Sequence, residues 1–302
     1  MKISSRTRVL VTGASGSLGW VLSGALASRC KVTGTYCSHQ LVPDGVEGLE
    51  LDLDRDPGSI GGVVALVKPD IIVHAAAVTD PDLCEHDVKT AFRVNFEATH
   101  ELALAAAQRG ARLVYLSTDL VFDGRRGNYS ESDQPRPLSV YGMSKLRGEE
   151  GALTACPGAL VARSTLIYGF GSPSSKTFLS KLLEVLCDGR RMQLFTDQRR
   201  NPILVEDLAE AIVCALKKDL TGIYHVGGSE CASRYDFGKV VCRVFGFDED
   251  LLVPVTMEDA VFPARRPQDA TLNIARLVEA TGFTPSGLLE GLTRARSGHS
   301  TQ

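Results

Sequence analysis

A tyrosine and a lysine lie four residues apart in the segment YGMSK at residues 141–145. On a helix, residues at this spacing lie one turn apart on the same face. A nearby ammonium group favours the phenolate and lowers the pKa of a phenol from about 10, so the pair could transfer protons. Tyr141 and Lys145 therefore indicate acid–base chemistry, and the alternative is an ordinary solvated helix face.

A glycine-rich turn near the N-terminus indicates that a dinucleotide could take part in this chemistry. The β-branched run at residues 8–12 is typical of a buried parallel strand, and GASGSLG at residues 13–19 leads from it into a helical pattern. Glycine allows backbone N–H groups to approach a pyrophosphate, which the positive end of the helix dipole also attracts. The context predicts a dinucleotide site rather than a plain turn. Its expected residues are Gly13, Ser15, Gly16, Ser17, Leu18 and Gly19.

The end of the second predicted strand, residues 31–36, bears on the choice of cofactor. An acidic residue at this place would hold the ribose 2′-hydroxyl of NAD. The chain instead continues with Cys37, Ser38, His39 and Gln40. Ser38 could donate to a 2′-phosphate and His39 could add partial charge, so NADP(H) is favoured and NAD(H) stays open.

Hydroxyl side chains end the fifth predicted strand, residues 112–117. Ser117 and Thr118 would face the crevice in which open α/β sheets bind ligands, although they could simply cap a turn. Upstream, small side chains at residues 75–77 would let a dinucleotide lie against the backbone. On a long helix predicted from residue 81 to about residue 108, Asn95 is a candidate buried polar anchor.

Paired arginines later in the chain suit an anionic substrate, because guanidinium groups can donate to a diphosphate in bidentate fashion. They are Arg199 with Arg200 and Arg265 with Arg266. The alternative is a set of surface charges paired with acidic residues.

Composition excludes several classes of protein. The 302 residues carry a formal net charge of −3, which offers no nucleic-acid surface, and no apolar run is long enough to span a bilayer. The N-terminus lacks a signal-peptide pattern. Eight cysteines are scattered without metal-ligand spacing, so we expect free thiols in a reducing cytoplasm and no metal site.

The motifs together resemble the extended short-chain dehydrogenase/reductase superfamily, and within it the dTDP-4-dehydrorhamnose reductase family. The turn has the spacing TGxxGxxG, and the resemblance covers nearly the whole chain. The matching segments are residues 12–19, 75–77, 117–124, 141–145, 163–169, 266–267 and 272–273.

The resemblance implies an α/β fold, with a Rossmann-type doubly wound parallel sheet and a small C-terminal α/β substrate-binding lobe. Residues 1–165 would form the NAD(P)-binding domain, with a return around residues 203–226, and residues 166–302 would form mainly the lobe. The third predicted strand, residues 46–53, would bring Asp52 and Leu53 to the adenine, although Asp52 could instead be a turn residue.

The resemblance also assigns roles to single residues. The catalytic set would be Tyr141, Lys145 and Thr118, with Ser117 as the fallback for Thr118. Cofactor contacts beyond the glycine turn would come from Ser38, His39, Asp52, Leu53, Ala75, Ala76, Ala77, Asn95, Tyr141, Lys145 and Ser164. Substrate contacts would come from Thr118, Asp119, Arg200 and Arg266.

The chain departs in two places from the motifs of related enzymes, and these departures limit which activities are expected. Dehydratases of the superfamily carry Thr-Asp-Glu after the fifth strand, whereas this chain has Leu120 in the third position, which argues against dehydration. The reductase family carries Gly-x-Pro-Thr before a late Asp-Leu-Ala helix. The arginines at 199 and 200 and Ile203 replace that pattern and leave the sugar open.

The sequence thus predicts an NADP(H)-dependent reductase of a keto group on a nucleotide-sugar-like small molecule. Tyr141 would protonate the developing alkoxide, Lys145 would lower the tyrosine pKa, and Thr118 would bind the carbonyl oxygen. One alternative is a non-catalytic NADP-binding subunit resembling the regulatory β subunit of methionine adenosyltransferase. Another is a sugar-nucleotide epimerase. A homodimer is a further open expectation, and no nucleic-acid or membrane partner is expected.

Overall fold

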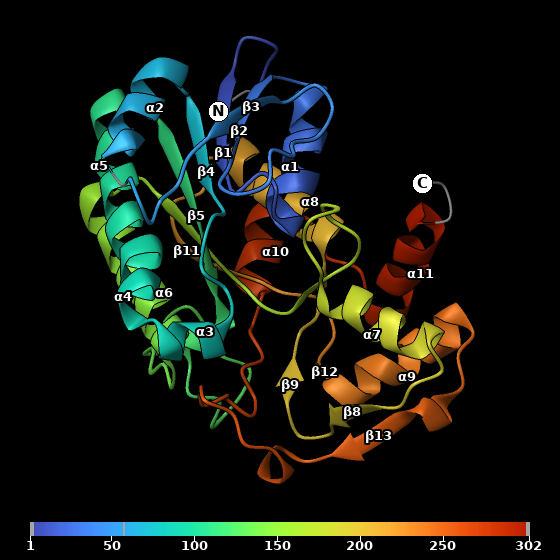
Figure 1. The fold of residues 1–302 in the computed structure, drawn as a ribbon. Coiled ribbons are helices and arrows are strands. Elements are labelled where there is room, and N and C mark those ends of the chain that lie inside the picture. Colours follow the sequence, from blue (N-terminus) through green and yellow to red (C-terminus); the bar gives the residue numbers. More distant parts are fainter. Residues whose placement is uncertain (1–2, 57, 300–302) are drawn as a thin grey trace.

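The computed structural model describes residues 3–56 and 58–299, and within them seven parallel strands form one central sheet (Figure 1). The spatial order is β11-β6-β5-β4-β1-β2-β3, so the chain winds outward in both directions from β1. This is the expected doubly wound topology, whose ligand crevice lies where the strand order reverses. The strands are β1 (Arg8–Thr12), β2 (Lys31–Tyr36), β3 (Glu47–Glu50), β4 (Ile71–His74), β5 (Arg112–Thr118), β6 (Leu160–Ser164) and β11 (Gly222–Val226).

Helices cover both faces of the sheet. One layer comprises α1 (Ser17–Ala27), α8 (Val205–Lys217) and α10 (Ala275–Thr281), and the other comprises α2 (Ser59–Val67), α5 (Ala98–Arg109) and α6 (Val140–Ala155). In α1, Leu18, Leu22 and Leu26 recur every fourth residue and are buried against the strands. Each such leucine stabilises the fold by roughly 1.5–3 kcal/mol, which fixes the start of α1 beside the end of β1.

A smaller lobe with its own core lies beside the carboxyl ends of the strands (Figure 1). Leu179, Leu182, Phe237 and Leu292 are fully buried at its centre. Its elements are α7 (Phe178–Cys187), α9 (Arg234–Phe245), α11 (Leu288–His299) and the parallel pair β8 (Met192–Phe195) and β13 (Leu252–Val255). Two short pairs connect the lobe to the sheet domain, namely β7 (Ile167–Tyr168) with β10 (Ile203–Leu204) and β9 (Arg199–Arg200) with β12 (Ala232–Ser233).

The long helix predicted from residue 81 is interrupted. It consists of α3 (Pro81–His86), α4 (Val88–Phe92), a π-helical turn (Arg93–Glu97) and α5. Asp87 leaves the helical conformation, and its side chain accepts the backbone N–H of Thr90 at 3.0 Å, which starts a new helix. The break turns residues 81–97 around the mouth of the crevice instead of along one straight axis.

The third predicted strand, residues 46–53, is shorter than expected. β3 ends at Glu50, because Asp52 Oδ1 accepts the backbone N–H groups of Asp54 (2.9 Å) and Arg55 (3.1 Å) in a turn. At the end of the described chain, α10 and α11 are separate helices, because Gly282 ends α10 with φ of 74°. In the described part of the chain, no helix is both long and apolar enough to cross a membrane.

Packing between α6 and the sheet leaves no room for a side chain at Gly148. A Cβ there would overlap the Tyr115 hydroxyl and the Asn95 carbonyl oxygen. Gly148→Ala should therefore lower the free energy of unfolding by about 1–3 kcal/mol in denaturant titrations. Gly62→Ala in α2 is the matched control, because nothing lies within 4 Å of a Cβ placed there. This substitution should raise the free energy of unfolding by about 0.5–1 kcal/mol. Equal stability of Gly148→Ala and wild type would contradict this packing.

Candidate active site

A cavity of about 850 Å³ lies between the sheet and the lobe. Residues at or just beyond the carboxyl ends of four adjacent strands line it: Gly13 after β1, Ala75 after β4, Thr118 of β5 and Ser164 of β6. The lobe supplies Phe178 and other side chains on the opposite wall. The volume is within the range of small-molecule and cofactor sites.

The glycine-rich turn forms one end of this cavity, and all six of its predicted residues line it. Gly13 has φ of 70°, and a Cβ there would lie 2.8 Å from the backbone of Ala76. A Cβ at Gly19 would overlap the carbonyl oxygen of Gly13. The cap of α1, Gly16, provides no side-chain hydrogen bond, so the N–H groups of the first helical turn are open to the cavity. This backbone fits a pyrophosphate.

A loop of the lobe rests on the same turn. The hydroxyls of Ser17 and Ser175 hydrogen-bond at 2.9 Å, and Ser174 Oγ donates to the carbonyl oxygen of Ser15 at 3.0 Å. A Cβ at Gly171 would lie 2.5 Å from the Cα of Ser17. The glycine-rich turn is therefore covered from the lobe side.

The part of the cavity beside β3 is lined by Asp52, Leu53 and the end of β2. Asp52 is a turn residue that also lines the cavity, and its contact with an adenine stays a prediction. Ser38 and His39 are exposed and lie outside the lining residues, whereas Cys37, which the sequence did not single out, is among them. The alanines at 75–77 line the floor as expected.

Asn95 lies behind the cavity wall and not in it. The backbone N–H of Val78 donates to Asn95 Oδ1 (2.9 Å), and Asn95 Nδ2 donates to the Val78 carbonyl oxygen (3.0 Å) and to Ser144 Oγ (3.0 Å). Its side chain is fully buried. It therefore acts as the buried anchor that its position suggested, holding the loop after β4 against α6, and a direct cofactor contact is not part of this arrangement.

Tyr141, Lys145 and Thr118 come together on the cavity wall. Ser139 caps α6 by accepting the N–H of Gly142 (3.2 Å), which places Tyr141 and Lys145 in its first two turns. Thr118 Oγ1 accepts the N–H of Leu120 (3.2 Å) and donates to Asp119 Oδ1 (3.1 Å). The three side chains expected from the sequence share one wall.

Burial dominates the proton affinities of this group. It raises the pKa of Tyr141 well above its ordinary value, and a side-chain hydrogen bond with Thr118 only partly opposes this. Burial also lowers the pKa of Lys145 to about 7, against the attraction of Glu149. Lys145 Nζ lies 4.2 Å from the centre of the Tyr115 ring. Lys145 is not among the groups that shift the Tyr141 pKa, so the lowering expected from the lysine is not found, and desolvation keeps the phenol protonated.

Ser117 lines the cavity, but its hydroxyl is bound to a buried carboxylate. Its hydroxyl donates to Glu149 Oε1 at 2.5 Å. Glu149 in turn forms a bidentate ion pair with Arg163, with Nη2 2.7 Å from Oε2, and both side chains are 2% exposed. Because this buried pair uses the Ser117 hydroxyl, Thr118 is the hydroxyl next to Tyr141. Ser164, by contrast, lines the cavity with a buried Oγ that lacks a partner among the described residues.

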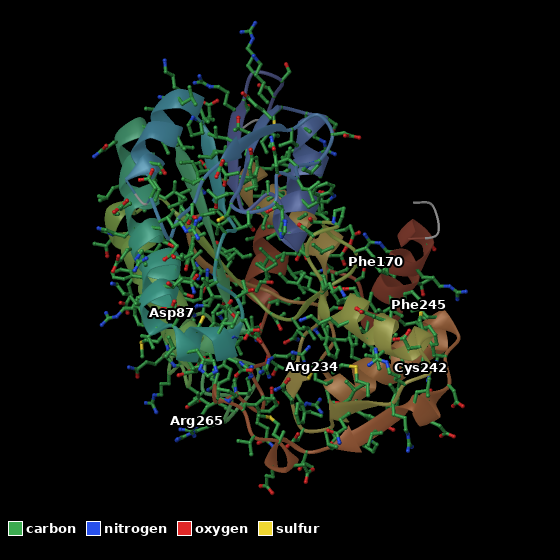
Figure 2. The ribbon with its side chains drawn as sticks, in the orientation of Figure 1. Asp87, Phe170, Arg234, Cys242, Phe245 and Arg265 are labelled. Atoms are coloured by element: carbon green, nitrogen blue, oxygen red, sulfur yellow. The ribbon has the colours of Figure 1, made fainter. Side chains whose placement is uncertain are left out.

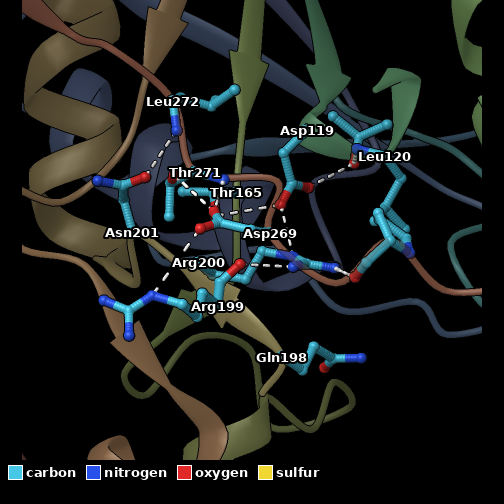
Figure 3. A network of polar contacts seen from close by, with 12 residues as sticks. Asp119, Leu120, Thr165, Gln198, Arg199, Arg200, Asn201, Asp269, Thr271 and Leu272 are labelled. Carbon is cyan, nitrogen blue, oxygen red and sulfur yellow. Dashed lines mark hydrogen bonds and ion pairs between the residues drawn. The ribbon is translucent and has the colours of Figure 1, made fainter. Parts of the chain in front are cut away.

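Asp119 and Arg200 line the cavity and form a buried ion pair (Figure 3). Arg200 Nε lies 2.9 Å from Asp119 Oδ2, Nη1 donates to the Gln268 carbonyl oxygen (3.2 Å) and Nη2 donates to that of Pro267 (3.0 Å). Both side chains are about 5% exposed, at 5% and 6%. The protein itself occupies most donors of Arg200, which matches the alternative of a paired charge better than a diphosphate ligand.

The other three arginines of the pairs differ in position. Arg266 lines the cavity, with Nη2 2.7 Å from Asp82 Oδ2. Arg265 and Arg199 are exposed and outside the lining residues. Arg234 lines the cavity but was missed, because an arginine after a helix cap looks like any solvated helix residue. Among the described residues, no cluster of His, Cys, Asp or Glu could hold a metal ion.

Known proteins are similar to this chain in sequence and in structure. The family model described as "RmlD substrate binding domain" matches residues 7–297. Methionine adenosyltransferase 2 subunit beta of Danio rerio is 34% identical over 301 residues, covering 91% of this chain and 87% of that protein. A dTDP-4-dehydrorhamnose reductase of Aggregatibacter actinomycetemcomitans is 30% identical over 312 residues, covering 96% and 98%.

A solved structure gives the same result. The crystal structure of dTDP-4-dehydrorhamnose reductase from Bacillus anthracis in complex with NADP superposes with a TM-score of 0.83 at 27% identity, covering 97% of this chain and 99% of that one. The agreement therefore extends from the glycine-rich turn through the lobe, and the chain belongs to the RmlD substrate binding domain family.

Proposed function

We propose that the protein is an NAD(P)H-dependent oxidoreductase that reduces a keto group on a nucleotide-activated sugar. The observation that carries this proposal is the single cavity that joins a pyrophosphate-shaped turn to Thr118, Tyr141 and Lys145. The reductase relatives, one of them solved with NADP, support the same class of reaction.

The residues at the turn fit a dinucleotide, because side chains at Gly13 and Gly19 would fill the space next to the open helix N-terminus. When bound, the cofactor supplies the hydride. We favour NADP(H) over NAD(H), since the lining residue directly after β2 is Cys37 and not an acid that would hold a ribose hydroxyl.

In this proposal Tyr141 donates its proton to the oxygen that becomes the alcohol. A phenol whose pKa is raised by burial stays protonated at neutral pH and suits the strongly basic alkoxide. Thr118 stabilises the charge on the same oxygen by turning its hydroxyl proton from Asp119 Oδ1 to that oxygen. Lys145 carries the ammonium donor that would reach ribose hydroxyls.

The tyrosine assignment gives the first test. Tyr141→Phe should keep NADPH binding, measured by fluorescence titration, and lower kcat by about 10²–10⁴-fold with a 4-keto nucleotide sugar, because only the acid is lost. Tyr235→Phe in α9, outside the cavity lining, should leave both quantities unchanged. Unchanged turnover in Tyr141→Phe would contradict the assignment of Tyr141 as the proton donor.

The buried lysine gives a second test through pH. Its folded-state pKa of about 7 lies below the ordinary value of 10.5, so between these values the unfolded chain binds more protons and stability rises with pH. Relative to Lys145→Met, the wild type should gain up to about 1.4 kcal/mol per pH unit in this window. Denaturant titrations at pH 7, 8 and 9 measure the difference, and parallel curves for the two proteins would contradict a lowered pKa.

A second candidate function follows from the likeness to methionine adenosyltransferase 2 subunit beta. In that case the cavity would bind a dinucleotide without turnover, and the protein would bind a catalytic subunit of that enzyme. Absence of NADPH oxidation with every keto nucleotide sugar, together with such binding in sedimentation experiments, would favour it. An epimerase would interconvert sugars without net oxidation of cofactor. The same sedimentation data test the predicted homodimer.

A further inference from the structure

Five buried side-chain nitrogen or oxygen atoms lack a hydrogen-bond partner among the described residues. Three of them belong to residues that line the cavity: Ser164 Oγ, Arg234 Nη1 and Arg266 Nη1. A buried polar atom without a partner costs roughly 1–3 kcal/mol, and more when it is charged, so native proteins keep few of them. Two unused guanidinium nitrogens in one cavity point to an anion that belongs there.

Arg234 differs from the other arginines of the cavity in its neighbours. Arg200 is paired with Asp119 at 2.9 Å, and Arg266 is paired with Asp82 at 2.7 Å. Arg234 Nε donates to Gln198 Oε1 at 3.0 Å, and its guanidinium lies 4.4 Å from the centre of the Phe178 ring. Both of these partners are neutral, so among the described residues Arg234 has no ion-pair partner of the kind that Arg200 and Arg266 have.

The location of Arg234 sets where an anion would lie. It is the first residue of α9 in the lobe, and Figure 2 shows it between the lobe and the sheet domain, whereas Arg265 lies at the periphery. Burial and the like charges of Arg200 and Arg266 lower the pKa of Arg234 to about 9, against the attraction of Asp119, which still leaves Arg234 charged at neutral pH. A nearby anion would relieve this repulsion.

We propose that Arg234 binds an oxyanion of the substrate and so restricts the cavity to substrates that present a carboxylate or phosphate to the lobe. This inference rests on the proposed function and deepens it, because it names the substrate class. The shared chemistry is a guanidinium facing two oxygens, which a diphosphate or a carboxylate on the sugar ring could provide.

The experiment measures binding of UDP, UDP-glucose and UDP-glucuronate to the full chain saturated with NADPH, by calorimetric titration. Arg234→Gln should weaken binding of an anionic ligand about tenfold or more, because it leaves the anion without its charged donor. Arg234→Lys should recover part of the loss, since it restores the charge but not the bidentate geometry. Arg265→Gln is the matched control and should change nothing, because that side chain is exposed and outside the cavity lining.

The three ligands separate the two sources of the oxyanion. An equal loss for all three ligands assigns Arg234 to the diphosphate, and a loss confined to UDP-glucuronate assigns it to the sugar carboxylate. If Arg234→Gln binds all three as tightly as wild type, or wild type binds NADPH and none of the three, the inference is overturned.

Two controls keep these outcomes separate from folding and from the proposed function. An unchanged NADPH affinity shows that the variant is folded, and Arg234→Met replaces the Gln variant under the same criterion if that check fails. A wild-type protein that does not bind NADPH overturns the proposed function itself, independently of Arg234.

Discussion

The ion pair between Asp119 and Arg200 connects the two halves of the molecule at the cavity. Asp119 follows β5 of the central sheet, and Arg200 belongs to β9 and also holds the carbonyl groups of Pro267 and Gln268. Removing one partner of a buried pair typically costs about 3–5 kcal/mol, because the other charge remains unpaired. Thr118 also donates to Asp119, so the position of the proposed oxyanion donor depends on the same interaction.

A second buried pair supports the other side of the same wall. Glu149 lies one helical turn beyond Lys145 on α6 and pairs with Arg163 of β6. Because Arg163 neutralises Glu149, the carboxylate only partly offsets the desolvation of Lys145, whose pKa stays near 7. The two ion pairs thus lie beside the proposed catalytic side chains, and among the described residues Arg234 is a cavity-lining arginine without an ion-pair partner.

Local patterns made much of this site predictable from the sequence. The glycine-rich turn, the alanines at 75–77 and the Tyr141–Lys145 spacing each depend on a few neighbouring residues, and the doubly wound parallel sheet followed from the resemblance. Tertiary pairing was not predictable in this way. Arg200 and Arg234 are both arginines beside short strands, and only the folded chain shows that one is saturated and the other is not. The raised pKa of Tyr141 likewise depends on burial, which helical spacing does not reveal.

The loop that covers the glycine-rich turn has a consequence for the time scale of the proposed reaction. The contacts of Ser174 and Ser175 with Ser15 and Ser17 lie directly over the place that fits a pyrophosphate. A dinucleotide held there would leave only when this loop separates from the turn. The rate at which these serine contacts open would then set how long the cofactor stays bound. Exchange of cofactor between turnovers would therefore depend on the mobility of the lobe as well as on the affinity of the turn.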